Sequence, residues 1–196
     1  MRKQWFGDSR DYVKWSCIRH EAGKQFHVVY AVMLRPDSFN DPRLDPIVAE
    51  FFDTYKNFRV LEGLFPVRFE VVSEQYEKKS ADRYFARLTE IIQAAQKKGK
   101  VLVFLDPDTG IEPAGSGDDK HLRARDIKTI CNALGVGDKV VIYQHALRDV
   151  SWIEYFSSRL KQLACETHCD LGTAFHAPGV AKDVCFFTLT KNSAGQ

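Results

Sequence analysis

The stretch Lys100-Val-Leu-Val-Phe-Leu105 runs directly into Asp106-Pro-Asp-Thr-Gly110. The unbroken apolar run is typical of a parallel strand that is buried on both faces at the centre of a sheet. Pro107 fixes its own φ angle and keeps Asp106 out of the helical region, and Gly110 accepts backbone angles that other residues avoid. We therefore expect a central strand over residues 100–105. At its carboxyl end we expect a tight turn that directs carbonyl and carboxylate groups at one small volume.

Outward from this strand, strand-like and helix-like segments alternate along the chain. This order predicts an α/β fold with a three-layer, Rossmann-like architecture, in which helices cover both faces of a mostly parallel sheet. The last two strands flank the turn Pro178-Gly179 and predict a C-terminal antiparallel pair. We expect one domain over residues 1–196, with a flexible tail from about residue 191. The expected strands cover 27–34, 67–72, 100–105, 139–143, 169–176 and 183–190, and the expected helices cover 8–22, 46–55, 80–98, 122–134 and 151–164.

The composition is that of an ordinary globular protein. The 196 residues are 44% hydrophobic and 28% charged, with a formal net charge of +2, so overall charge points to no class of partner. Five cysteines at irregular spacing predict reduced thiols and a cytoplasmic protein, and no apolar run is long enough to span a membrane. No Gly-x-Gly-x-x-Gly follows the first expected strand, and Walker and Gly-x-Ser-x-Gly motifs are absent, which argues against P-loop enzymes and serine hydrolases.

Two neighbouring expected strands end in polar residues. Asp106 and Asp108 follow one strand, and Gln144 and His145 follow the other. Ligands of open α/β sheets bind beyond the carboxyl ends of the strands, so we expect these side chains to share a site. Alternatively, the aspartates hydrogen-bond their own backbone and the turn is only structural.

The same residues also permit metal chemistry. Asp106, Asp108 and Glu112 offer the oxygen ligands that Mg²⁺ or Mn²⁺ prefers, with His145 as a base or a further ligand. A divalent-metal-dependent phosphodiesterase or nuclease is therefore an alternative function.

Basic residues follow the Asp106 turn. Arg123, Arg125 and Lys128 lie in the next expected helix, where a basic rim would suit a phosphate-bearing substrate, and an ordinary solvated helix face is the alternative.

The N-terminal stretch from Phe6 to Trp15 is unusually polar for a helix start. Gly7 and Asp8 are placed to begin the helix. Lys14 follows Asp11 by one turn, which equally predicts an ordinary surface ion pair.

Two segments resemble a known class of enzymes. The loop beginning at Asp106 resembles the Asp-Pro-Pro-Tyr loop of amino-methyltransferases that use S-adenosylmethionine, with Asp108 and Thr109 in place of the second Pro and the Tyr. The stretch Phe6-Gly7-Asp8 through Asp11, Lys14 and Trp15 resembles the N-terminal motif of the ribosomal RNA adenine N6 methyltransferase J family. The combined pattern, with Tyr143-Gln144-His145, is also similar to a group of bacterial proteins without an assigned role.

This resemblance implies a methyltransferase-like protein that uses S-adenosylmethionine on an amine of a nucleic acid or nucleotide-like substrate. Asp106 would accept a hydrogen bond from the amine and the Pro107 carbonyl would orient it, while Lys14 would lie near the cofactor. A non-catalytic binding module on the same fold is the third hypothesis. The resulting site comprises catalytic Asp106, Pro107, Asp108 and His145, cofactor-binding Gly7, Asp8, Asp11, Lys14 and Trp15, and substrate-binding Gln144, Thr109, Gly110 and Arg123.

Overall fold

The computed structural model describes residues 9–33, 68–72, 74–115, 120–148 and 151–193. Its main sheet has seven strands in the order β2-β1-β3-β6-β9-β7, with β8 paired to β9. The four strands β2, β1, β3 and β6 are parallel, and β9 runs antiparallel to β6, β7 and β8. The mostly parallel sheet with a C-terminal antiparallel part confirms the predicted fold class. The strands are β1 (Phe26–Ala31), β2 (Phe69–Val72), β3 (Lys100–Leu105), β6 (Lys139–His145), β7 (Cys169–Leu171), β8 (Phe175–His176) and β9 (Val184–Lys191).

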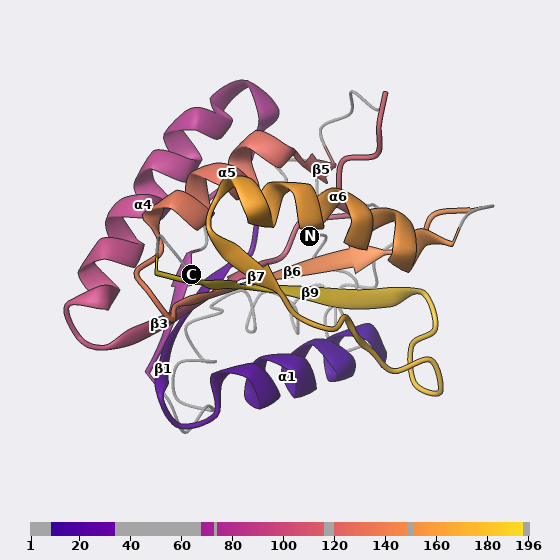
Figure 1. Ribbon diagram of the computed structural model, residues 1–196, viewed down its shortest axis with the longest axis horizontal. Coiled ribbons are helices and arrows are strands. Elements are labelled where there is room, and N and C mark those ends of the chain that lie inside the picture. The colour runs from indigo at the N-terminus through magenta and orange to yellow at the C-terminus, as the bar shows by residue number, and fades with distance from the viewer. Residues whose placement is uncertain (1–8, 34–67, 73, 116–119, 149–150, 194–196) are drawn as a thin grey trace, which may run out of the picture.

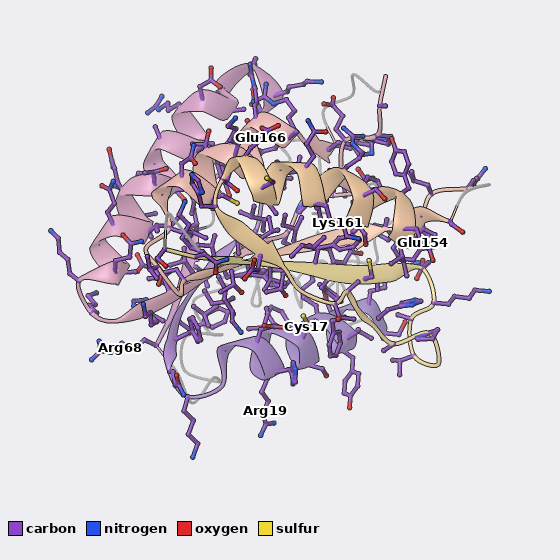
Figure 2. The ribbon with its side chains drawn as sticks, in the orientation of Figure 1. Cys17, Arg19, Arg68, Glu154, Lys161 and Glu166 are labelled. Carbon is purple, nitrogen blue, oxygen red and sulfur yellow. The ribbon has the colours of Figure 1, made fainter. Side chains whose placement is uncertain are left out.

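Helices cover both faces of the sheet, as Figure 1 shows. Helix α1 (Ser9–Ala22) lies on one face. Helices α4 (Ala81–Gln96), α5 (Ala124–Ala133) and α6 (Trp152–Glu166) lie on the other. Cys17 of α1 is fully buried, whereas Arg19 points to solvent (Figure 2). Among the described residues, no helix is long and apolar enough to cross a bilayer.

Strand β3 lies at the centre of the sheet, as predicted. Strand β3 has the predicted bounds, pairs with β1 on one side and β6 on the other, and is fully buried from Val101 to Leu105. Its partner β1 is also buried, from His27 to Ala31, and the register sets Ala31 opposite Leu105. The ladder continues one residue further, because the Asp106 amide donates to the Ala31 carbonyl at 3.0 Å. Asp106 therefore lies level with the carboxyl end of β1.

The order in which the chain adds strands to the sheet changes direction between β1 and β3. From β1 the chain reaches β2 on one side, and from β2 it returns through α4 to β3 on the other side. In open parallel sheets this switch point leaves a crevice beyond the carboxyl ends of the strands, where ligands bind. Met33, two residues past the end of β1, has a positive φ of 49°, which is uncommon for a residue other than glycine.

Some local expectations differ from the structure. The helix expected from residue 80 begins one residue later, after a 3₁₀ turn, Lys78–Ser80; Ser80 is its N-cap residue, but its hydroxyl donates to the Glu77 carbonyl at 3.3 Å and makes no capping bond. A small parallel sheet of β4 (Gly110–Ile111) and β5 (His121–Leu122) was not predicted, since two-residue strands give no periodic signal. The expected helix over 46–55 lies outside the described residues.

Candidate active site

Lys14 of α1 is buried between two carboxylates. Its Nζ lies 2.7 Å from Asp11 Oδ1 and 2.9 Å from Asp106 Oδ2, and Lys14, Asp11 and Asp106 are 3%, 3% and 2% exposed. Burial lowers the pKa of Lys14. The negative charges of Asp106 and Asp11 together raise this pKa by more than burial lowers it, so the net shift is upward. The ammonium therefore stays charged. The expected Asp11–Lys14 pair exists, but it is buried rather than on the surface, because Asp106 reaches the same nitrogen.

A tyrosine from the sheet completes this cluster. The Tyr30 hydroxyl of β1 donates to Asp106 Oδ2 at 2.5 Å. Burial, followed by the charge of Asp106, raises the pKa of Tyr30 well above its ordinary value, so the phenol remains a neutral donor. One carboxylate oxygen of Asp106 thus receives hydrogen bonds from both Lys14 and Tyr30. This fixes the position of the turn at the end of β3.

Aromatic rings surround the Lys14 ammonium. Its Nζ lies 5.4 Å from the ring centroid of Tyr143 and 5.7 Å from that of Trp15. Trp15 also packs edge-on against Tyr30, with ring centroids 5.4 Å apart. Cation–π contacts of this kind favour the charged form of a desolvated lysine. The N-terminal residues Asp11, Lys14 and Trp15 are therefore joined to the carboxyl ends of β1, β3 and β6. Gly7 and Asp8 lie outside the described residues.

His145 lies at the end of β6, next to the Asp106 turn. Its Nε2 is 2.7 Å from the Tyr143 hydroxyl, and its backbone amide donates to the Thr109 carbonyl at 3.1 Å. Burial, and then the positive charge of Arg10, lower the pKa of His145, although the carboxylates of Asp183 and Asp108 oppose the shift. The imidazole is therefore neutral near pH 7 and able to accept a proton.

Gln144 joins the turn to β6. Its Oε1 accepts a hydrogen bond from the Ile111 amide at 2.6 Å, and its Nε2 donates to the His145 carbonyl at 2.7 Å. Gly110 has a φ of +115°, and a Cβ there would lie 2.5 Å from Gln144 Oε1. Thr109 donates through Oγ1 to the Lys120 carbonyl at 2.9 Å. Three of the four predicted substrate-binding residues, Gln144, Thr109 and Gly110, thus lie in the contacts between the turn and its neighbours.

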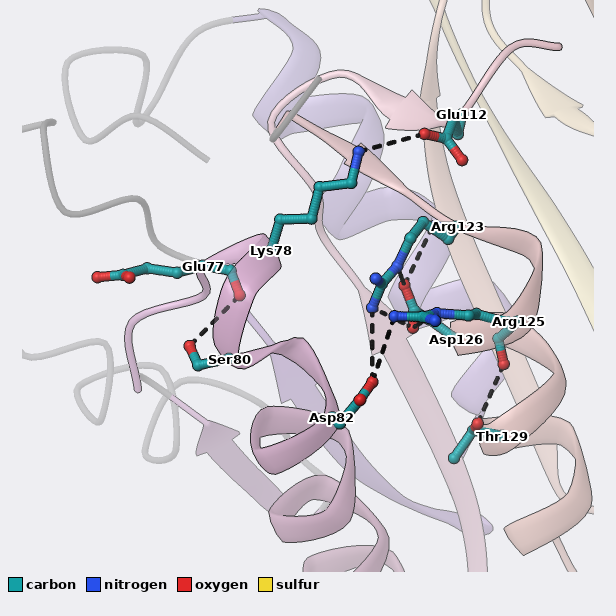
Figure 3. Close-up of polar contacts among 9 residues, drawn as sticks. All are labelled: Glu77, Lys78, Ser80, Asp82, Glu112, Arg123, Arg125, Asp126 and Thr129. Atoms are coloured by element: carbon teal, nitrogen blue, oxygen red, sulfur yellow. Dashed lines mark hydrogen bonds and ion pairs between the residues drawn. The ribbon is translucent and has the colours of Figure 1, made fainter. Parts of the chain in front are cut away.

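Arg123 lies at the start of α5, as Figure 3 shows. Its guanidinium donates to both carboxylate oxygens of Asp126, at 2.7 and 2.8 Å, and lies 3.8 Å from Asp82 of α4. Arg125 also approaches Asp82, at 3.4 Å. The basic residues that follow the Asp106 turn are therefore largely matched by carboxylates.

The three acids of the metal hypothesis do not form one cluster. Asp106 contacts Lys14 and Tyr30, whereas Glu112 Oε1 lies 3.5 Å from Lys78 Nζ (Figure 3). Within the described ranges, no three His, Cys, Asp or Glu side chains are grouped as a metal ion would require. The structure therefore offers no support for the nuclease hypothesis.

Sequence reasoning did not find several residues of this region. Tyr30 and Tyr143 are strand residues whose pattern only indicated burial. Tyr84, near the start of α4, is 6% exposed and its hydroxyl has no hydrogen-bond partner. Glu74 is an exposed acid two residues past β2. An acid at that place in a Rossmann-like fold can bind a ribose, so the order of the strands could have identified Glu74.

Comparisons with known proteins find methyltransferases of similar structure. The 1,6-didemethyltoxoflavin-N1-methyltransferase of Burkholderia thailandensis, solved with S-adenosylhomocysteine, is 9% identical with a TM-score of 0.48, covering 96% of this chain and 81% of that one. An O-methyltransferase family protein of the same organism is 12% identical with a TM-score of 0.45, covering 95% and 57%. A putative rRNA-methylase of Clostridium thermocellum is 11% identical with a TM-score of 0.40, covering 95% and 98%. No family model matches the chain, and no curated protein sequence matches it.

Proposed function

We propose that this protein binds S-adenosylmethionine at the switch point between β1 and β3 and methylates an amine of a nucleic acid or nucleotide-like substrate. One observation carries the proposal: the Asp-Pro-Asp-Thr-Gly turn lies level with the end of β1, and Lys14 and Tyr30 hold its first carboxylate in place. Ligands of open α/β sheets bind at this location, and the turn resembles the acceptor loop of amino-methyltransferases.

The residues present are chemically suited to an adenosyl ligand. The exposed carboxylate of Glu74 follows β2, where an acid can accept hydrogen bonds from a ribose diol. Tyr76, Tyr84 and Phe85 form an edge-to-face aromatic group, with ring centroids 5.4 to 6.0 Å apart. Such a wall is suited to a flat purine ring.

We assign different roles to the two aspartates of the turn. When bound, S-adenosylmethionine supplies an electrophilic methyl group. Because one oxygen of Asp106 is held by Lys14 and Tyr30, we assign Asp106 to positioning the turn as well as to orienting the amine beside the Pro107 carbonyl. Asp108 is more exposed, and its charge acts on His145. We assign to Asp108 the role of accepting the proton that the amine loses as it gains the methyl group.

Calorimetric titration with S-adenosylhomocysteine tests the cofactor part of the proposal. We expect the wild-type protein to bind, and Glu74→Gln to bind at least about tenfold more weakly, because a charged acceptor contributes more than a neutral one. Glu154→Gln removes an exposed acid of α6 (Figure 2) and is the matched control, which should bind like the wild type. Failure of the wild type to bind would refute the proposal.

Transfer of a tritiated methyl group to RNA, DNA and free nucleotides tests the reaction. Asp108→Asn should lower transfer by about 10- to 100-fold with little change in S-adenosylhomocysteine affinity, since it removes a proton acceptor and no cofactor contact. Cofactor binding without transfer to any acceptor would favour the non-catalytic binding module. Binding of Mg²⁺ or Mn²⁺ that is lost in Asp108→Ala would favour the metal hypothesis instead.

A further inference from the structure

A buried hydroxyl without a hydrogen-bond partner lies at the switch point. Tyr84 projects from the first turn of α4 and is 6% exposed, yet its hydroxyl makes no hydrogen bond. Leaving such a group unpaired costs about 1–3 kcal/mol, so buried hydroxyls are normally satisfied. No group of the described protein interior therefore satisfies the Tyr84 hydroxyl with a hydrogen bond.

The surroundings of the Tyr84 hydroxyl place it at the ends of three strands. The charges of Glu74, past β2, and Asp106, past β3, both act on it, and so does the backbone of Met33, past β1. Met33 does not meet it in a hydrogen bond of normal geometry. Burial raises the pKa of Tyr84, with a smaller contribution from Glu74, so the phenol stays neutral. A neutral hydroxyl can both donate and accept a hydrogen bond.

Its neighbours identify the part of the ligand that it suits. Tyr84 packs edge-to-face with Tyr76 and Phe85, each at 5.4 Å between ring centroids, so its ring is part of an apolar aromatic wall. A neutral phenol in such a wall serves the uncharged polar groups of a nucleoside. It would serve the charged amino and carboxylate groups of the methionyl part poorly, because neither charge would be compensated. Glu74, on the same side, already suits a ribose.

We propose that the Tyr84 hydroxyl is a binding contact for the nucleoside part of the ligand, which satisfies the hydroxyl only in the complex. This inference rests on the proposed function and adds a residue that determines affinity and specificity for the nucleoside. It also gives a reason for a tyrosine rather than a phenylalanine at this position of an otherwise apolar helix face.

Tyr84→Phe tests the inference directly. We expect about three- to tenfold weaker binding of S-adenosylhomocysteine and of adenosine, the range for one neutral hydrogen bond, with a melting temperature equal to or above that of the wild type. Thr188→Val is the matched control. Thr188 carries another buried, unpartnered hydroxyl, but it lies on β9 opposite Val141, within the sheet, so its loss should leave both affinities unchanged.

Equal affinities of the wild type and Tyr84→Phe would overturn this inference while leaving the proposed function intact. Equal losses in Tyr84→Phe and Thr188→Val would also overturn it, because they would show a general effect of hydroxyl removal. A wild-type protein that binds neither ligand refutes the proposed function and this inference together. Should Tyr84→Phe fail to fold, a crystal structure of the wild-type complex decides: the hydroxyl must lie within hydrogen-bond distance of the nucleoside.

Discussion

Two aspartates at opposite ends of the central parallel strands are equally buried but have different hydrogen-bond partners. Asp106, after β3, and Asp138, before β6, are each 2% exposed. Asp138 accepts hydrogen bonds from three neutral donors: the amides of Val101 and Gly135 at 2.9 and 2.8 Å, and Gln96 Nε2 at 2.8 Å. Asp106 is instead paired with a charged lysine and a phenol.

This difference separates a structural carboxylate from a candidate functional one. Asp138 ties together β3, the end of α4 and the turn after α5, and all three of these donors are uncharged. The pairing of Asp106 with Lys14 places two opposite charges in the protein interior. A buried ion pair rarely stabilises a fold more than well-packed apolar residues would. We therefore relate the ion pair at the carboxyl ends of these strands to the proposed function rather than to folding.

The largest effect should follow from removing the charged partner. Lys14→Met leaves Asp11 and Asp106 buried without their cation and should lower the free energy of unfolding by about 3–5 kcal/mol. Gln96→Met removes a neutral partner of Asp138 and should cost only about 1 kcal/mol. Urea unfolding measures both. Adding Asp106→Asn to Lys14→Met should restore part of the lost stability. Similar losses in Lys14→Met and Gln96→Met would show that the two aspartates do not differ in this way.

Removing the structural carboxylate should have the next largest effect. Asp138→Ala leaves the amides of Val101 and Gly135 without their acceptor, while Gln96 Nε2 keeps the Ala133 carbonyl, and should cost about 2–3 kcal/mol. Because Asp138 lies at the amino edge of the sheet, S-adenosylhomocysteine affinity should not change once the protein is folded. Urea unfolding and calorimetry together check this. A fall in affinity would mean that the amino edge also contributes to the site.

The glycines beside the two aspartates should respond unequally. At Gly110, with φ +115°, a Cβ would lie 2.5 Å from the held side chain of Gln144. At Gly137, with φ +80°, it would meet only the flexible end of Lys100, at 3.0 Å. We expect Gly110→Ala to cost about 2–3 kcal/mol and Gly137→Ala about 1 kcal/mol in thermal or urea unfolding. Adding Gln144→Ala to Gly110→Ala should restore part of the lost stability. If it does not, the loss comes from the backbone angle of residue 110 alone.

The smallest effect concerns pH. Burial is the largest cause lowering the pKa of both His145, at the carboxyl ends of the strands, and His27, at their amino ends. At each histidine positive charges add to the shift, from Arg10 at His145 and from Lys98 and Arg68 at His27. Carboxylates oppose it at both, Asp183 and Asp108 at His145 and Glu70 at His27. The unfolded chain therefore binds protons first, and stability should fall as the pH drops below about 6.5 toward the folded pKa values. His145→Gln and His27→Gln should each flatten part of this decline in urea unfolding followed across pH. A steeper decline in either variant would mean that the folded pKa of that histidine is raised rather than lowered.

Much of the fold followed from local pattern. The apolar run of β3 and the alternation of strands and helices predicted the layers and the mostly parallel sheet, because burial on both faces of a strand needs a continuous apolar stretch. The bounds of β3 agreed residue for residue, and β6 continued through Gln144 and His145 to the expected edge. The short β4–β5 pair and the 3₁₀ turn before α4 did not follow, since neither has a period that a sequence displays.

A carboxylate-bearing turn at the end of a central buried strand could be predicted from the residues alone, because proline, glycine and an apolar run act on their own neighbourhoods. What that carboxylate contacts required the folded chain. Asp106 meets Lys14 from 92 positions away and Tyr30 from 76, and these contacts depend on strand register and on the face that α1 covers. For the same reason, the unpaired hydroxyl of Tyr84 becomes visible only when every neighbouring donor and acceptor has its place in space.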